Sequence, residues 1–149
     1  MVLDAALSFL HFTLLLILAA SLGAQAFVLR LPVSAAGLKA LARADMFYGL
    51  SAIGLIAAGF ARVYFGVGDE NYYLTSHVFW AKIATFALIG LISILPTRRF
   101  IQWARAARAD AGFAPAEADV KRVRGLVLAE LHLLALVVLF AALMARGIG

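Results

Sequence analysis

The chain has 149 residues, of which 65% are hydrophobic and only 14% are charged, and its mean hydropathy is +1.00. A soluble domain carries about a quarter charged residues, so this composition excludes a surface that faces water throughout. The absence of cysteine excludes disulfides, thiolate-bound metals and c-type haem attachment. The net charge of +5 at pH 7 would be compatible with a nucleic-acid partner. The positions of the basic residues, described below, argue against one.

Four apolar segments each reach the length of about 20 residues with which a helix crosses the hydrocarbon core of a bilayer. They lie at about residues 5–29, 46–66, 78–95 and 126–145. The third is expected to stop at Pro96, because proline ends or kinks a helix. The segments lack the alternation of an outer-membrane barrel, and four strands cannot close one. The sequence therefore predicts an all-α membrane protein, with residues 1–149 forming a single four-transmembrane-helix bundle.

The first segment is interpreted as a membrane helix that is retained. Ala24-Gln25-Ala26 resembles a signal-peptide cleavage site. The region before it, however, contains Asp4 and no Lys or Arg, and the apolar stretch is too long for the hydrophobic part of a signal.

Lys and Arg are distributed unevenly among the connections between the segments. The connection at 67–77 has neither, but contains Asp69 and Glu70. Because basic connections remain in the cytoplasm, both termini are predicted to lie outside. The basic excess is then explained by topology and by contact with anionic lipid headgroups, and no nucleic-acid partner is expected. The basic residues of the other two connections are Arg30, Lys39, Arg43, Arg98, Arg99, Arg105, Arg108, Lys121, Arg122 and Arg124.

The long connection after Pro96 has an amphipathic pattern of its own. Residues 97–109 carry four arginines together with Phe100, Ile101 and Trp103. This combination is typical of an amphipathic helix that lies in the membrane interface. We expect that interfacial helix to end before Phe113-Ala114-Pro115.

Polar residues inside the predicted membrane helices fall on one stripe of each helix. Ionisable groups in hydrocarbon are costly and require a partner, a wet cavity or a function. At about 100° per residue, neighbouring polar positions can be compared around each helix. The first three stripes are predicted to face one another, and they consist of Ser8, His11 and Gln25; Tyr48, Ser51 and Arg62; and Lys82, Thr85 and Ser93.

Three of these residues are expected at a similar depth in the outer half of the bundle. With the termini outside, His11 lies about 10 Å below the outer surface, and Arg62 and Lys82 lie about 6 Å below it. One imidazole and two cations without a carboxylate at that depth favour an anionic cofactor. Haem b fits, with His11 as iron ligand and Arg62 and Lys82 at the propionates.

The same residues also have simpler interpretations. Arg62 and Lys82 are close enough to the surface to extend to the headgroups, or to pair with Asp69 and Glu70. His11 has the alternative of a hydrogen bond to a serine on a neighbouring helix.

The fourth helix contains Glu130 and His132. Because they are two residues apart, they project about 200° apart and cannot both face the bundle centre. His132 is about 10 Å too deep to be the second iron ligand opposite His11. A secondary polar cluster in the inner half is predicted, either a structural hydrogen-bond network or a proton relay, and it comprises Gln25, Tyr48, Ser93, Glu130 and His132.

Short motifs give the chain a family resemblance. It resembles a family of four-helix bacterial inner-membrane proteins described as a domain of unknown function. The motifs are Leu10-His11, Arg43-Ala-Asp-Met-Phe-Tyr-Gly49, Phe79-Trp-Ala-Lys82 and Pro96-Thr-Arg-Arg-Phe100.

More distantly, the chain is similar to the HemJ-type protoporphyrinogen oxidases, which share the four-helix layout and bind haem b. That similarity places the family's helix-one histidine on His11, its Ala-Lys-Leu on 81–83, and its Asn-Glu-x-Pro on 129–132, where the Asn and Pro are absent.

The sequence thus predicts a multi-pass protein of the bacterial inner membrane that binds haem b and takes part in electron transfer or tetrapyrrole-related redox chemistry. Whether it is an enzyme is left open. One alternative is a cofactor-free accessory subunit of a larger membrane complex. Another is a small transporter, which would require a homo-oligomer because four helices leave little room for a pore.

Overall fold

The computed structural model describes residues 1–65 and 74–148, and in these residues it consists of four long α-helices without strands. Each helix is long and apolar enough to cross a membrane. The predicted all-α four-helix membrane fold is therefore confirmed. The helices are α1 (Val2–Val28), α2 (Ala35–Phe65), α4 (His77–Ala109) and α5 (Glu117–Met144).

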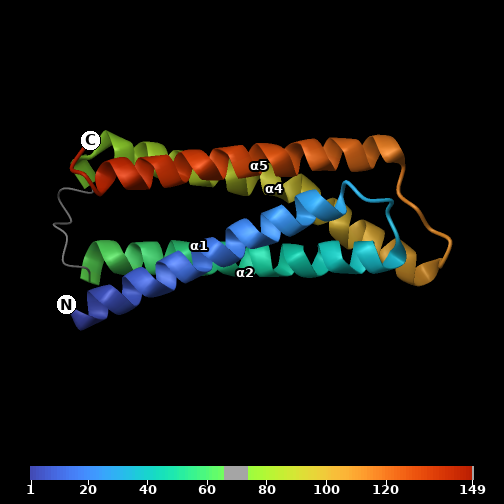
Figure 1. The fold of residues 1–149 in the computed structure, drawn as a ribbon, viewed down its shortest axis with the longest axis horizontal. Coiled ribbons are helices and arrows are strands. Elements are labelled where there is room, and N and C mark those ends of the chain that lie inside the picture. Colours follow the sequence, from blue (N-terminus) through green and yellow to red (C-terminus); the bar gives the residue numbers. More distant parts are fainter. Residues whose placement is uncertain (66–73, 149) are drawn as a thin grey trace.

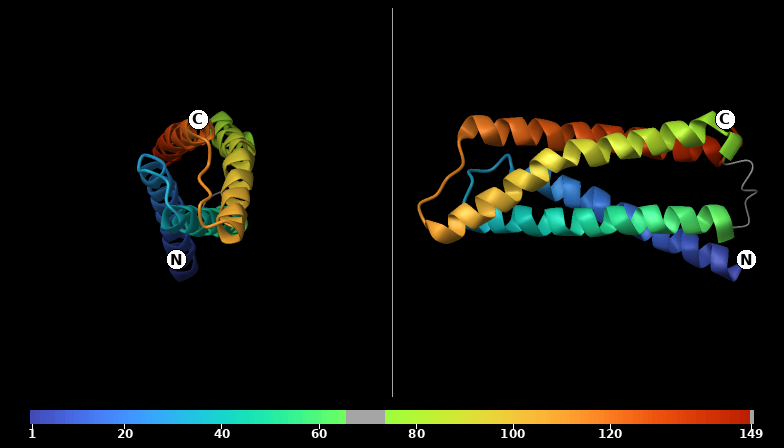
Figure 2. Two further views of the ribbon diagram at one scale, coloured as in Figure 1. Left: turned by 90° about the vertical axis from the view of Figure 1, so that its right-hand side faces the viewer. Right: turned by 180° about the vertical axis from the view of Figure 1, so that it is seen from behind.

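The helices form a ring in which neighbours in sequence are also neighbours in space. The most extensive contacts join α1 to α2 and α4 to α5, while smaller contacts join α2 to α4 and α1 to α5 (Figure 1 and Figure 2). Both chain termini lie at the same end of the bundle, as predicted (Figure 1). The α1–α2 and α4–α5 connections lie at the opposite end.

The two ends are packed differently. We call residues 1–17, 52–65, 74–90 and 133–148 the terminal half, and residues 18–51 and 91–132 the connection half. Most of the fully buried side chains belong to the connection half, where they come from all four helices. Examples are Leu22, Leu41, Phe100, Val123 and Val127, each at most 1% exposed.

All four helices extend beyond the predicted membrane spans. The second was expected from about residue 46, yet α2 begins at Ala35 and includes Lys39 and Arg43. The fourth was expected from about residue 126, yet α5 begins at Glu117. The predicted limits followed apolarity, whereas a helix continues into polar sequence as long as its backbone hydrogen bonds form.

The prediction that the third helix stops at Pro96 was wrong. Pro96 lies inside α4 and is fully buried. Proline removes one backbone donor, and packing by neighbouring helices makes that loss tolerable in a membrane helix. Residues 97–109, expected to form a separate interfacial helix, are instead the last turns of α4. Phe100 and Trp103 are 1% and 4% exposed and belong to the bundle core, with ring centroids 6.0 Å apart.

Local capping fixes both ends of α4. The Ser76 hydroxyl accepts a hydrogen bond from the Phe79 backbone N–H at 3.1 Å, which is a helix N-cap. The Trp80 indole donates to the Leu74 carbonyl at 2.9 Å. After the helix, the Asp110 carboxylate accepts from the Gly112 backbone N–H at 2.8 Å and turns the chain toward α5.

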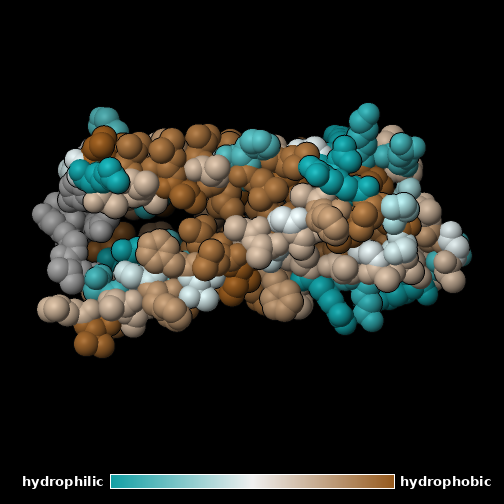
Figure 3. Space-filling model, in the orientation of Figure 1, coloured by the Kyte–Doolittle hydropathy of each residue, from teal (hydrophilic) through white to brown (hydrophobic). Residues whose placement is uncertain are grey.

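The outer surface is that of a protein surrounded by lipid. On the face drawn in Figure 3, a hydrophobic band covers most of the surface, and hydrophilic residues gather toward the connection end. Large apolar side chains such as Phe9, Leu16 and Leu91 are more than half exposed. Contiguous exposed apolar surface of this extent is not a feature of water-soluble monomers.

Candidate functional site

The terminal half brings together the three residues that the sequence placed at one depth. His11, Arg62 and Lys82 come from α1, α2 and α4, and each is half-buried. The positive charges of Arg62 and Lys82 both act on His11, and that of Arg62 acts on Lys82. The Lys82 ammonium also lies 5.0 Å from the centroid of the Phe79 ring. An imidazole within reach of the charges of two cations is an electropositive site for an anionic group.

His11 is held against α2. Its Cε1 atom lies 3.7 Å from the position that a Cβ would take at Gly59, and its ring meets Phe12 edge-on at 6.4 Å between centroids. The Nδ1 atom is buried and has no hydrogen-bond partner among the described residues. The alternative hydrogen bond to a serine is thus not formed at this atom. A buried polar atom without a partner is uncommon and calls for an explanation.

Arg62 has the same property. Its Nε atom is buried without a hydrogen-bond partner in the part of the chain that the structure describes. The alternative pairing with Asp69 and Glu70 lies outside the described residues. In the space-filling view, the surface of this half is hollowed between the α1–α2 pair and the α4–α5 pair, and hydrophilic side chains line part of the hollow (Figure 3).

A second polar cluster lies near the middle of the bundle. Glu130 of α5 is 1% exposed and Tyr48 of α2 is 5% exposed. The Tyr48 hydroxyl interacts with the side chains of Glu130 and Ser93, which joins three helices. Gln25 is also buried, but its amide nitrogen has no hydrogen-bond partner among the described residues. The structure thus unites Tyr48, Ser93 and Glu130, and the described contacts of this cluster do not include Gln25.

Glu130 and His132 face opposite ways. Glu130 points into the bundle, whereas His132 is exposed on the outer face of α5. The His132 Nδ1 atom lies 2.6 Å from the Leu128 carbonyl oxygen of its own helix. His132 is therefore not part of the inner polar cluster to which the sequence assigned it, because the bundle leaves that face of α5 uncovered.

Sequence reasoning missed Asp45. Its carboxylate accepts a hydrogen bond of 2.8 Å from the Thr97 hydroxyl, and its charge acts on Tyr48 and Glu130. Asp45 was missed because the second span was placed after it. Its spacing from Tyr48 could have placed Asp45 in this cluster. Asp45 precedes Tyr48 by three residues, and residues three apart lie on the same face of a helix.

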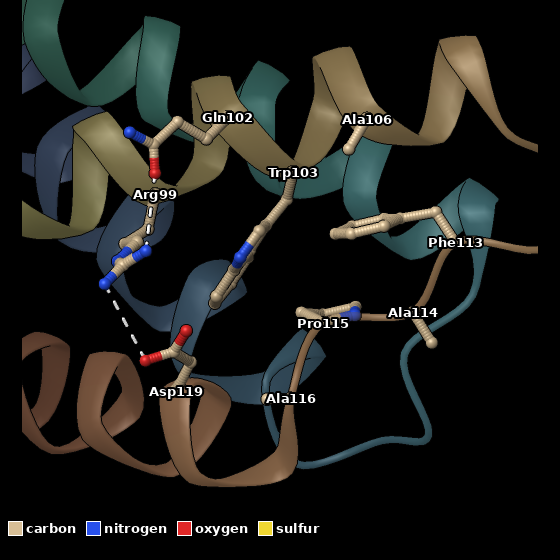
Figure 4. Close-up of a pocket in the computed structure, with 9 residues that line it drawn as sticks. All are labelled: Arg99, Gln102, Trp103, Ala106, Phe113, Ala114, Pro115, Ala116 and Asp119. Atoms are coloured by element: carbon tan, nitrogen blue, oxygen red, sulfur yellow. Dashed lines mark hydrogen bonds and ion pairs between the residues drawn. The ribbon is translucent and has the colours of Figure 1, made fainter.

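A groove of about 330 Å³ runs between α2 and α4, and its lining includes Asp45, Tyr48 and Ser93. A second recess of about 330 Å³ lies at the connection end, between the last turns of α4 and the start of α5 (Figure 4). There Trp103 stands between Phe113 and Pro115 on one side and the Arg99–Asp119 ion pair, 3.8 Å long, on the other (Figure 4).

The comparison with known families covers almost the whole chain. The model of the family described as "Predicted membrane protein (DUF2214)" matches residues 3–149. The chain belongs to this family. No curated protein and no solved structure matches it. Membership of DUF2214 agrees with the four membrane-spanning helices and assigns no chemistry to them.

The described residues of this DUF2214 chain lack a ready-made cluster for a bare metal ion. They contain no group of three or more His, Cys, Asp or Glu side chains that would hold a bare metal ion. Haem differs in this respect, because the porphyrin supplies four ligands and the protein supplies only axial ones. The single imidazole of His11 is compatible with axial ligation of a haem iron.

Proposed function

We propose that this membrane protein binds haem b in the terminal half of its bundle, with His11 as an axial ligand. The observation that carries the proposal is the buried Nδ1 atom of His11, which has no hydrogen-bond partner among the described residues. Neutral imidazole is the form that ligates iron. The terminal half that contains His11 is hollowed between the helix pairs (Figure 3).

Arg62 and Lys82 are assigned to the propionates. Both are cations whose charges act on His11, and the Arg62 Nε atom has no hydrogen-bond partner among the described residues. Guanidinium and ammonium groups form strong, charge-assisted hydrogen bonds with carboxylates. When bound, the haem supplies one-electron redox chemistry, in electron transfer or in reactions of tetrapyrroles. We carry haem binding over from the motif resemblance to HemJ-type oxidases at His11 and residues 81–83. That resemblance does not fix the reaction, because a fold hosts many chemistries.

We further propose that both termini face away from the cytoplasm. Ten Lys and Arg residues belong to the connection end or its adjoining helical turns, whereas only Arg62, Lys82 and Arg146 lie toward the terminal end. The excess of basic residues identifies the cytoplasmic side. A periplasm-dependent reporter fused to the C-terminus should be active, and a reporter active only in the cytoplasm would reverse the orientation.

The direct test of haem binding is the absorption spectrum of the wild-type protein after purification in mild detergent from haem-replete bacteria. We expect a Soret band with about one haem b per protomer and a shift of the visible bands on reduction. A colourless protein that also fails to take up added haemin would overturn the proposal.

The propionate assignment has its own test. Replacing Arg62 or Lys82 by Gln should weaken haem retention by about 1–3 kcal/mol, the scale of a hydrogen bond to a charged group. Arg146→Gln removes an exposed cation near the same end and serves as the control, with unchanged retention expected. Equal retention in all three variants would remove Arg62 and Lys82 from the site.

An accessory subunit without a cofactor is the second candidate, and one observation favours it. His132 is exposed on the lipid-facing side of α5 in the middle of the bundle. A polar group at that position is costly in lipid unless another protein covers it. Copurification of a partner that is lost on His132→Leu, from a protein without a Soret band, would favour this function. A small transporter would instead require an oligomer with a shared polar path.

A further inference from the structure

We propose that the groove between α2 and α4 binds the head group of a lipid-soluble quinol, an aromatic ring with two hydroxyl groups and an apolar tail. The inference rests on the shape of this groove, its opening toward lipid, and the hydrogen-bonding groups at one of its ends. It does not depend on haem at His11. The residues that line the groove include Asp45, Tyr48, Gly49, Gly90 and Ser93.

The groove has small residues on both walls. Gly49 and Ala52 line it from α2, and Ala87 and Gly90 line it from α4. A Cβ at Gly49 or Gly90 would meet nothing within 4 Å, so these glycines do not serve close helix packing. They leave open space instead. Its volume of about 330 Å³ suits a small ring system, since small-molecule sites begin at about 300 Å³.

The groove opens to the bilayer. Ile53 and Ile56, which line its apolar part, are 68% and 49% exposed. A ligand therefore enters sideways from the lipid and must dissolve in it. The Phe86 ring on the opposite helix offers an aromatic surface for stacking. An isoprenoid-type tail would lie along Ile53 and Ile56 and continue into the bilayer.

The polar part of the groove accepts hydrogen bonds. The Thr97 hydroxyl already donates to Asp45 at 2.8 Å, and the Ser93 hydroxyl donates to the Gly90 carbonyl at 2.8 Å. The protons of the Thr97 and Ser93 hydroxyls are thus committed, while oxygens of Asp45 and Ser93 still have lone pairs that can accept a hydrogen bond. A ligand that brings its own O–H donors matches this end better than one that brings only carbonyls.

A helix of a second copy is a poorer occupant of the polar end of the groove. Its backbone offers no free donors, because its own hydrogen bonds use them, whereas a hydroxylated ring brings two O–H groups.

The experiment measures the uptake of a decyl-substituted 1,4-benzoquinol, kept reduced, by lipid nanodiscs with and without the protein. We expect saturable excess uptake of about one quinol per protomer. The dimethyl ether of the same quinol has the same ring but no O–H donors, and it should bind about tenfold more weakly, as expected for losing a hydrogen bond to a charged group. Equal binding of the two compounds would contradict the assignment.

Matched variants locate the site. Gly90→Leu places a side chain in the groove and should abolish saturable uptake. Gly23→Leu is the control, because Gly23 is exposed on α1 and its Cβ would also meet nothing within 4 Å. Asp45→Asn, which keeps the shape, should weaken binding of the quinol without affecting the dimethyl ether.

Three results would overturn the proposal. One is unchanged uptake in Gly90→Leu, and another is the absence of saturable uptake in the wild type. The third is a wild-type dimer without quinol uptake that Gly90→Leu dissociates, which would make the groove an interface between copies. The same measurement on a haem-free His11→Ala variant separates this inference from the haem proposal, since quinol uptake should persist there.

Discussion

The two halves of the bundle use their interior in different ways. In the connection half, Leu22, Leu41, Phe100 and Val127 from four helices fill the centre and are almost fully buried. In the terminal half few of the described side chains are fully buried, and the charges of Arg62 and Lys82 act on His11 from two other helices. Because lipid tails are as apolar as leucine, helix association in a membrane depends on packing and on polar contacts. The connection half therefore carries the stability of the fold.

Buried polar groups occur in both halves. In the connection half Tyr48 interacts with Glu130, and Thr97 donates to Asp45. Among the described residues, the amide nitrogen of Gln25 and one oxygen of Glu130 are buried there without a hydrogen-bond partner. In the terminal half, buried nitrogens of both His11 and Arg62 are unpartnered among the described residues. The charge of Arg62 acts on His11, and we propose that one ligand satisfies both side chains.

The largest expected effect comes from the aromatic core of the connection half. Phe100→Ala should destabilise the protein by about 3 kcal/mol or more, because a buried ring leaves a cavity between packed helices. Phe60 of the terminal half is 61% exposed, so Phe60→Ala should change stability little. Unfolding by increasing denaturing detergent, followed by circular dichroism, measures both. Similar losses in the two variants would remove the distinction between the halves.

A smaller effect is expected at the buried polar contact. Tyr48→Phe removes the hydroxyl that Glu130 contacts and should cost about 1–3 kcal/mol, the penalty of an unsatisfied buried group. Tyr64 is 62% exposed near the end of α2, and Tyr64→Phe is the matched control with no expected loss. If the Tyr48 variant is as stable as the control, Glu130 is satisfied by another group and the cluster is not structural.

The smallest effect concerns glycines of α2. A Cβ at Gly54 would approach the Leu14 side chain to 3.0 Å, whereas one at Gly49 would meet nothing within 4 Å. Gly49→Ala should therefore stabilise the protein by up to about 1 kcal/mol through helix propensity. At Gly54 that gain should be offset, because Leu14 must move. Thermal unfolding of the two alanine variants measures which of them is the more stable. A Gly54→Ala variant more stable than Gly49→Ala would contradict close packing of α1 against α2 at Gly54.

Most of the fold could be predicted from the sequence because apolar runs of membrane-spanning length are specific to lipid-embedded helices. The helix ends could not be predicted in the same way. Apolarity marks the part in hydrocarbon, so the start of α2 at Ala35 and the continuation of α4 through Pro96 remained hidden. Phe100 and Trp103 followed an amphipathic pattern, which does not distinguish a helix at the membrane interface from one packed on a bundle.

The polar clusters were predictable in part. Angular position along each helix was sufficient to bring His11, Arg62 and Lys82 together, and likewise Tyr48 and Ser93. The sequence predicted that Glu130 and His132 project to opposite sides of α5. It could not predict which of the two faces the interior, because that depends on which side of α5 the helices α1 and α4 cover, and this is known only from the packed bundle. Asp45 was missed because the second span was placed after it, and His132 was assigned to a cluster that it does not reach.

The measurement that tests the central claim most directly is the haem content per protomer of His11→Ala and His132→Ala, from the Soret absorbance after purification in detergent. Both variants replace a histidine in a membrane helix, but only His11 lies in the terminal half beside Arg62 and Lys82. We predict loss of haem from His11→Ala and a full complement in His132→Ala, with both proteins inserted in the membrane. A full complement of haem in His11→Ala would contradict the account.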